Sequence, residues 1–211
     1  MIISHKYKFI FIKTAKTAGT SIEVFLSSLC GPTDIVTPII PTMKGHDPRN
    51  VDGFFNHISA HAIREKISPD CWDGYLKFCV ERNPWDKTLS HYHMNNFRQK
   101  GSLTFEQFIA KRSFPINYIK YTEPNDPTAI IVDEILYYEN FTDGLESVFK
   151  KLLVPFNGSL GVKAKSEYRT DRRHYRECYT PEQAEVIRET FQPEIELHGY
   201  RFSLLPQMTR Q

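Results

Sequence analysis

The sequence lacks any long hydrophobic run. No apolar stretch approaches the roughly 20 residues that a helix needs to cross a bilayer, so a membrane-spanning helix and a membrane partner are not expected. A signal-like N-terminal pattern is also missing, because the first residues pass directly into an apolar stretch. From these two absences we expect a cytoplasmic protein.

Cysteine is scarce, with four residues at irregular spacing, which favours reduced thiols over a disulfide framework. The chain has no Cys-x-x-Cys pair, no His-Glu-x-x-His motif and no acidic calcium loop, so no metal site is expected. A net charge of only +2 does not call for a polyanionic partner and disfavours a nucleic-acid surface. The 211 residues, with 40% hydrophobic content, fit a single domain over residues 1–211.

The most informative segment is the loop at residues 13–21 (KTAKTAGTS), which follows an unbroken apolar run at residues 9–12. Such a run is typical of a buried parallel strand, and a helix-like pattern begins at Gly19. Backbone N–H groups at a helix start form an anion site that suits phosphate. Further donors would be the ammonium of Lys16 and the hydroxyls of Thr17, Thr20 and Ser21.

This loop differs from the Walker loop of nucleoside triphosphate hydrolases. In the Walker loop the lysine follows the last glycine, whereas here Lys16 precedes Gly19 and no second glycine lies upstream. No strand ending in aspartate is obviously placed to hold magnesium. Alternatively, the loop binds no anion and is only the capped start of a helix, in which a lysine occurs by chance.

A second polar segment follows the expected strand at residues 75–81. Pro84 suits the first turn of a helix, Arg82 would end the strand, and Ser90 would lie about two turns into the helix. Arg82 and Ser90 could therefore meet one phosphate at the carboxyl edge of the sheet. Alternatively, Arg82 forms a surface ion pair and Ser90 is a solvated hydroxyl.

Together, the two segments resemble the nucleotide-binding elements of the sulfotransferase family. In that family the first element binds the 5′-phosphosulfate and the second binds the 3′-phosphate of 3′-phosphoadenosine 5′-phosphosulfate. The resemblance is closest to carbohydrate sulfotransferases, including the uronyl 2-O-sulfotransferases, whose first loop similarly reads Lys-Thr-small-small-Thr-Ser. Residues 133–141, 175–179 and 198–202 also look family-like.

The resemblance implies a role for each residue of the two motifs. Lys16 would contact the bridging oxygen and the leaving phosphate, and Arg82 and Ser90 would hold the 3′-phosphate. The 5′-phosphate would be held by Thr17, Ala18, Gly19, Thr20 and Ser21. A late arginine touches the nucleotide in the family, and the basic stretch at residues 163–176 offers Arg172 and Arg173, between which the sequence does not choose. Other basic residues of this stretch would attract an anionic acceptor such as an acidic glycan.

Two histidines are candidates for the base that takes a proton from the acceptor hydroxyl. His57 and His61 are four residues apart and would share one face of a helix expected over residues 57–67. The segment resembles the His-x-Ser stretch of the uronyl 2-O-sulfotransferases, where a histidine acts as the base, and His57 is the matching residue. His61 is the second candidate and Glu23 a weaker one, while cap or surface roles for either histidine stay open.

The order of the expected elements predicts an α/β fold. Strands are expected at residues 7–13, 75–81 and 130–138, and helices at 19–29, 57–67, 84–99, 104–112 and 141–152 and from Thr180 onward. This alternation predicts a central parallel sheet flanked by helices, and the resemblance implies a P-loop-like three-layer fold.

The resemblance implies sulfuryl transfer from 3′-phosphoadenosine 5′-phosphosulfate to a hydroxyl of a carbohydrate acceptor, which releases adenosine 3′,5′-bisphosphate without a metal ion. Two alternatives stay open. One is a P-loop nucleotide-dependent kinase, which would require magnesium and a triphosphate. The other is a catalytically inactive nucleotide-binding protein.

Overall fold

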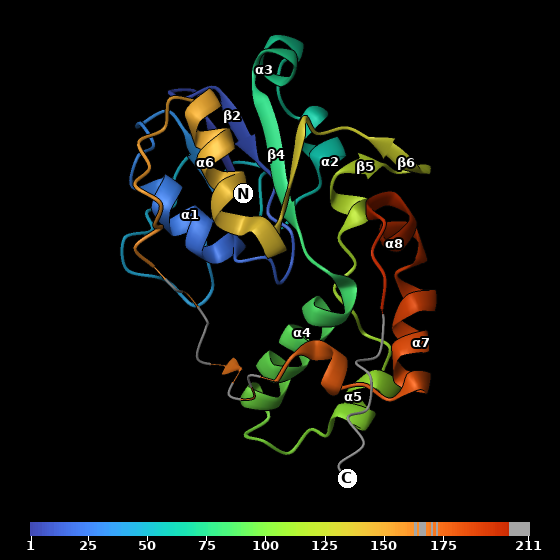
Figure 1. Ribbon diagram of the computed structural model, residues 1–211. Helices are drawn as coiled ribbons and strands as arrows, with labels where there is room; N and C mark the ends of the chain where they lie inside the picture. The colour runs from blue at the N-terminus through green and yellow to red at the C-terminus, as the bar shows by residue number, and fades with distance from the viewer. Residues whose placement is uncertain (163, 165–167, 170, 172, 203–211) are drawn as a thin grey trace. The chain divides into compact units, whose positions relative to one another are not determined.

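The computed structural model describes residues 1–162, 164, 168–169, 171 and 173–202 (Figure 1). The chain forms two compact units, and each is described by itself. The first unit comprises Met1–Arg82 and Asn117–Ala164, and the second comprises Asn83–Ile116 and Lys165–Gln211. That residues 1–211 act as one domain stays a prediction.

The first unit is built on a five-stranded sheet in the order β3-β1-β2-β4-β7. Its centre is parallel: β4 (Leu76–Glu81) pairs in parallel with both β2 (Phe9–Phe11) and β7 (Glu134–Tyr137). Strands β1 (Ile2–Ser4) and β3 (Ile35–Val36) add an antiparallel edge. The expected α/β fold with a central parallel sheet flanked by helices is confirmed, and the antiparallel edge was not expected.

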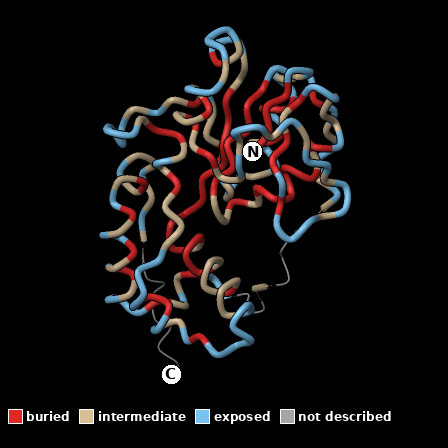
Figure 2. Tube along the Cα trace, turned by 180° about the vertical axis from the view of Figure 1, so that it is seen from behind, coloured by how far each residue is buried: buried red, intermediate tan, exposed pale blue. Residues whose placement is uncertain are grey.

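Helices α1 (Gly19–Ser27) and α6 (Phe141–Lys151) pack against one face of this sheet (Figure 1). Figure 2 shows the buried residues gathered along the strands. Phe78 of β4 lies at the centre of the core, with its ring centroid 5.8 Å from that of Phe9, 5.1 Å from that of Phe11 and 6.4 Å from that of Phe149. The core is therefore an aromatic layer between the parallel strands and the two helices.

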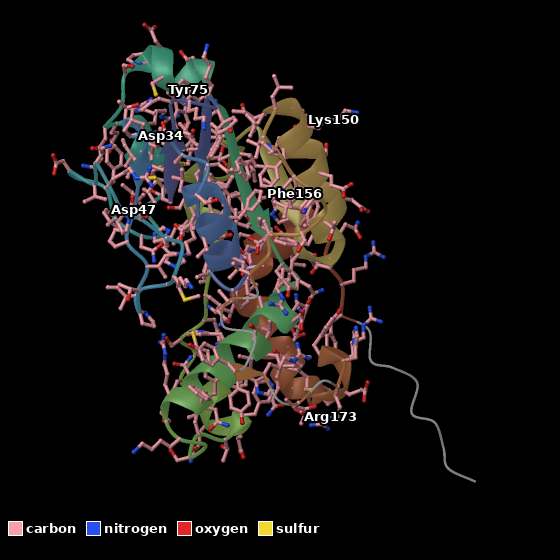
Figure 3. All side chains as sticks on the ribbon, turned by 90° about the vertical axis from the view of Figure 1, so that its left-hand side faces the viewer. Asp34, Asp47, Tyr75, Lys150, Phe156 and Arg173 are labelled. Carbon is pink, nitrogen blue, oxygen red and sulfur yellow. The ribbon has the colours of Figure 1, made fainter. Side chains whose placement is uncertain are left out.

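The long segment after α1 is fastened to the antiparallel edge. The Asp34 carboxylate, labelled in Figure 3, accepts hydrogen bonds from Ser4 Oγ (2.8 Å), His5 N (2.8 Å) and Gly31 N (2.9 Å). Arg49 donates to the carbonyl oxygens of Cys30 (3.2 Å) and Gly31 (3.0 Å). These bonds fix both ends of the stretch around β3.

Short elements complete the first unit. They are α2 (Ala60–Arg64), α3 (Pro69–Gly74), the 3₁₀ turns η1 (Tyr118–Lys120) and η2 (Tyr138–Asn140), and a two-stranded sheet of β5 (Thr122–Glu123) and β6 (Asp126–Ile130). The strand expected at 130–138 is in fact the end of β6 followed by β7, because the chain between them turns at residues 131–133.

The second unit is helical. It contains α4 (Pro84–Arg98), α5 (Phe105–Ala110), the 3₁₀ turn η4 (Tyr175–Glu177), α7 (Pro181–Thr190) and α8 (Gln192–His198). Trp85 organises its core: the indole N–H donates to Ala184 O at 2.9 Å, and Tyr179 Oη donates to Trp85 O at 2.7 Å. Thr180 caps α7 in a capping box, so the helix expected from Thr180 onward begins at Pro181.

Among the described residues, no helix has both the length and the apolar character that a membrane crossing requires.

Phe78→Ala is expected to lower the free energy of unfolding by about 3–5 kcal/mol, because the cavity would lie among three aromatic rings in the sheet core. Phe55→Ala is the matched control, since 57% of the Phe55 surface is exposed and little burial is lost. Urea unfolding of both variants checks the expectation, and equal losses in the two would refute the placement of Phe78.

Candidate functional site

The candidate site is the loop between β2 and α1. Lys16 and Ala18 have φ angles of 63° and 62°, so two non-glycine residues on either side of Thr17 adopt the left-handed conformation. Such an alternation turns successive backbone N–H groups toward one side and forms an anion-binding concavity. Helix α1 then begins without a side-chain cap, which leaves its first N–H groups to serve the same concavity.

Lys13 fixes the back of the loop. Its side chain is buried and forms an ion pair with Glu23 on α1. A Cβ at position 19 would lie 2.8 Å from Lys13 Cγ, so only glycine lets the helix start approach this lysine closely. Burial by itself would raise the pKa of the Glu23 carboxyl, but the positive charges of the N-terminal amine and of Lys13 hold it below its ordinary value. Glu23 is therefore a buried counter-ion, and a carboxylate with a lowered pKa is a poor acceptor for the proton of a hydroxyl.

The hydroxyl residues of the loop are held by hydrogen bonds within the unit. Thr14 Oγ1 lies 2.8 Å from Thr17 Oγ1 and also donates to Val80 O of β4. Ser21 Oγ accepts from Ala164 N at 3.0 Å, so the chain that leads into the basic stretch passes over the start of α1. Thr17, Thr20 and Ser21 are buried, as expected of groups that shape a binding loop.

Arg82 lies directly beside this loop. Its Nη1 donates to Lys16 O at 3.0 Å, and its guanidinium carbon lies 4.0 Å from the centroid of the Tyr138 ring. The structure thus brings together Lys16 and Arg82, which the sequence placed in two separate motifs. Ser90 lies on α4 in the second unit, and its expected role at the 3′-phosphate stays a prediction.

Two residues that the sequence analysis missed also hold the loop. The Asn117 side chain accepts from Ala15 N at 2.8 Å and donates to Ala15 O at 3.1 Å, and it donates to Glu81 Oε1 at 3.2 Å. Glu81 was detectable as a buried acid at the end of an apolar strand. Asn117 belongs to no local motif, and no sequence signal could have found it.

His57 is held in one tautomer. Its Nδ1 lies 3.0 Å from Lys13 O, and because a carbonyl oxygen only accepts, Nδ1 carries the proton and Nε2 is left as the acceptor. Burial, followed by the charge of Lys13, lowers the pKa of His57 from 6.5 to about 4. The imidazole is therefore neutral at neutral pH, in the form that can accept a proton.

The expected helix over residues 57–67 is wrong at its start. Ser59 caps α2 by accepting from Ala62 N at 3.3 Å, so the helix begins at Ala60 and His57 precedes it with a φ of 60°. The shared helical face of His57 and His61 is not formed. Nε2 of His61 instead lies 3.2 Å from a Glu65 carboxylate oxygen, and its Nδ1 lies 3.1 Å from Arg64 Nη2. Which of the two histidines acts as the base stays a prediction.

The two candidate late arginines are Arg172 and Arg173. Arg172 lies outside the described residues. The Arg173 guanidinium, labelled in Figure 3, is paired with Asp171, with Nη2 and Oδ2 2.6 Å apart, and Arg169 is paired with Asp86 at 2.8 Å. Contact of Arg172 or Arg173 with a nucleotide stays a prediction. Within the described part of the chain, no group of three or more His, Cys, Asp or Glu side chains is arranged to hold a metal ion.

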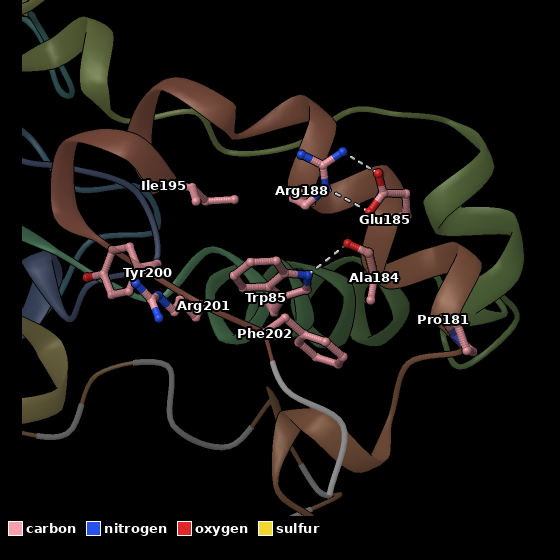
Figure 4. A pocket seen from close by; sticks show the side chains of 9 residues that line it. All are labelled: Trp85, Pro181, Ala184, Glu185, Arg188, Ile195, Tyr200, Arg201 and Phe202. Carbon is pink, nitrogen blue, oxygen red and sulfur yellow. Dashed lines mark hydrogen bonds and ion pairs between the residues drawn. The ribbon is translucent and has the colours of Figure 1, made fainter.

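The second unit has a pocket of its own, about 490 Å³ in volume (Figure 4). Trp85 and Arg188 both line it, and Arg188 is paired with Glu185. The pocket is lined by Trp85, Pro181, Ala184, Glu185, Arg188, Ile195, Tyr200, Arg201 and Phe202. None of the site residues expected from the sequence lies in it.

No family model matches the chain. An uncharacterized protein of Archaeoglobus fulgidus is 37% identical over 99 residues, which are 46% of this chain and 82% of the archaeal protein. The two proteins belong to one family. The name of this relative states no activity, so the function has to be inferred from the site.

Among solved structures, the chain resembles that of the mouse sulfotransferase SULT7A1 complexed with PAP. The TM-score is 0.54 and the identity is 14%, and the match covers 93% of this chain and 86% of the mouse chain. This likeness confirms the P-loop-like α/β fold that the sequence predicts.

The His57 ring is expected to titrate near pH 4, because it is buried beside Lys13. Between that value and the ordinary 6.5, the unfolded chain binds more protons at this position than the folded one, so stability should rise with pH across the interval. Histidine NMR signals followed against pH measure the midpoint, with His57→Gln to assign the signal and His61→Gln as the control. A His57 midpoint near 6.5 would contradict the buried, singly donating imidazole.

Proposed function

We propose that this protein transfers a sulfuryl group from 3′-phosphoadenosine 5′-phosphosulfate to a hydroxyl of a carbohydrate. The observation that carries the proposal is the loop between β2 and α1, where left-handed Lys16 and Ala18 precede an uncapped helix start beside Arg82. Further support comes from the fold, since the similar mouse sulfotransferase is complexed with PAP.

The loop would bind the donor through its 5′ end. Backbone N–H groups of residues 16–20 and the α1 dipole favour a phosphate there, and the Lys16 ammonium adds a charge beside the bridging oxygen. The proposed nucleotide contacts comprise Lys16, Thr17, Ala18, Gly19, Thr20 and Ser21 at the 5′ end, Arg82 and Ser90 at the 3′-phosphate, and Arg172 or Arg173 from the basic stretch.

In the proposed reaction the acceptor oxygen forms a bond to sulfur while the bond between sulfur and the bridging oxygen breaks. The electron pair of the broken bond passes to the phosphate, where Lys16 and the N–H groups stabilise the charge. The acceptor proton passes to Nε2 of His57, whose Nδ1–H is held by Lys13 O. His61 is the second candidate for this step. The scheme balances without a metal ion.

A carbohydrate acceptor and a cytoplasmic location belong to the same proposal. The carbohydrate acceptor rests on the resemblance of the first loop and of the His57 segment to carbohydrate sulfotransferases. The cytoplasmic location rests on the lack of a long hydrophobic run in the sequence. The basic stretch at residues 163–176 suits an anionic glycan, because positive charge concentrates such acceptors near the site.

Adenosine 3′,5′-bisphosphate is expected to bind the purified protein, and Lys16→Met should weaken the binding about tenfold or more, because a charge-assisted contact to phosphate is lost. Lys44→Met is the matched control, since Lys44 is exposed and lies outside the loop. Isothermal titration measures all three. No binding by folded wild-type protein would overturn the proposal, and stabilisation by ATP with magnesium instead would favour the kinase.

A further inference from the structure

Two side chains hold the carbonyl groups of consecutive loop residues. Asn117, which is 1% exposed, pairs with both the N–H (2.8 Å) and the C=O (3.1 Å) of Ala15, much as a neighbouring strand would. Arg82, which is 7% exposed, donates from Nη1 to Lys16 O at 3.0 Å. Both carbonyl oxygens are thereby fixed in direction by groups outside the loop.

The direction of a carbonyl fixes the direction of the next N–H. In a planar trans peptide the C=O of one residue and the N–H of the next point to opposite sides. Because Ala15 O points to Asn117 and Lys16 O points to Arg82, the N–H groups of Lys16 and Thr17 must point away from these two side chains. That is the orientation an anion-binding concavity requires.

The loop needs such support because its conformation is unfavourable. A non-glycine residue in the left-handed region costs on the order of 1 kcal/mol, and the loop contains two, Lys16 and Ala18. Such residues persist where the surroundings impose them.

The two holding residues share one anchor at the end of β4. Glu81 is fully buried, and its Oε1 accepts from Asn117 Nδ2 (3.2 Å) and from Arg82 N (2.8 Å). Its Oε2 accepts from Tyr121 Oη at 2.8 Å. The Arg82 guanidinium is further held over the Tyr138 ring, at 4.0 Å. The holding groups are therefore anchored to Glu81 at the end of β4, outside the loop.

We propose that Asn117 and Arg82 are positioning residues that keep the N–H groups of the loop turned toward the 5′-phosphate. For its ligand the inference rests on the proposed function, whereas the conformation of the loop does not depend on it. Under this proposal Arg82 has a role at the 5′ end of the nucleotide, in addition to the role expected at the 3′-phosphate.

The binding test uses adenosine 5′-monophosphate, which lacks the 3′-phosphate, beside adenosine 3′,5′-bisphosphate. Asn117→Leu keeps the branched shape of the side chain, Arg82→Met keeps an unbranched stem, and both remove the donors. Both variants should lose about tenfold or more in affinity for the monophosphate, since the aligned N–H groups are lost. Val148→Ala is the control, because it creates a cavity in the α6 core and lowers the melting temperature without touching the loop.

The binding results distinguish a role of Arg82 at the 5′-phosphate from a role at the 3′-phosphate. If Arg82→Met binds the monophosphate as wild type does and loses affinity only for the bisphosphate, Arg82 acts at the 3′-phosphate alone and the inference is wrong for it. If Asn117→Leu lowers the melting temperature as Val148→Ala does but keeps wild-type affinity, Asn117 is only structural.

A ligand-free measurement keeps the inference testable if the proposed function fails, that is, if wild-type protein binds neither nucleotide. The ¹³Cα chemical shifts of Lys16 and Ala18 report left-handed backbone. In Asn117→Leu and Arg82→Met these shifts should move toward right-handed values, while those in Val148→Ala stay unchanged. Wild-type shifts in the first two variants would overturn the inference whatever the nucleotide does.

Discussion

The parallel pairing of β2 with β4 is the constraint on which the site depends. It aligns Phe9 with Leu76 and Phe11 with Phe78, and it continues past the strands through the bond from Ile12 N to Phe78 O (2.9 Å). The segments that follow β2 and β4 therefore leave the sheet at the same edge, where open α/β folds bind their ligands. Without this register, the Lys16 carbonyl would not meet Arg82, and the loop would lose its outer support.

Two lysines three residues apart show how burial divides the roles within one loop. Lys13 is buried against the Glu23 carboxylate, so its charge is compensated inside the protein, and its stem and carbonyl position Gly19 and His57. Lys16 follows in a left-handed turn and is only partly buried. A buried ion pair gives little net stability, because desolvation offsets the attraction. The Lys13–Glu23 pair matters for geometry, since it fixes where the helix and the histidine lie.

The sequence was sufficient where a motif is local. The apolar run before the loop, the start of α1 at Gly19 and the place of Arg82 at the end of β4 were all predicted, because each depends on a few adjacent residues. Strands β1 and β3, of three and two residues, were missed. The expected start of α2 was wrong, although Ser59 is a recognisable cap, because the four-residue spacing of His57 and His61 also fits a helix that contains both. Asn117 is 102 residues from Ala15 in sequence, and only the fold brings the two together.

In the proposed function, the loop between β2 and α1 receives the 5′-phosphate of the sulfuryl donor. A crystal structure of the protein with adenosine 3′,5′-bisphosphate tests it most directly. We expect the 5′-phosphate within hydrogen-bonding distance of the backbone N–H groups of residues 16–20, with the Lys16 ammonium beside it. A nucleotide bound with its 5′-phosphate elsewhere and the loop empty would contradict the proposed site.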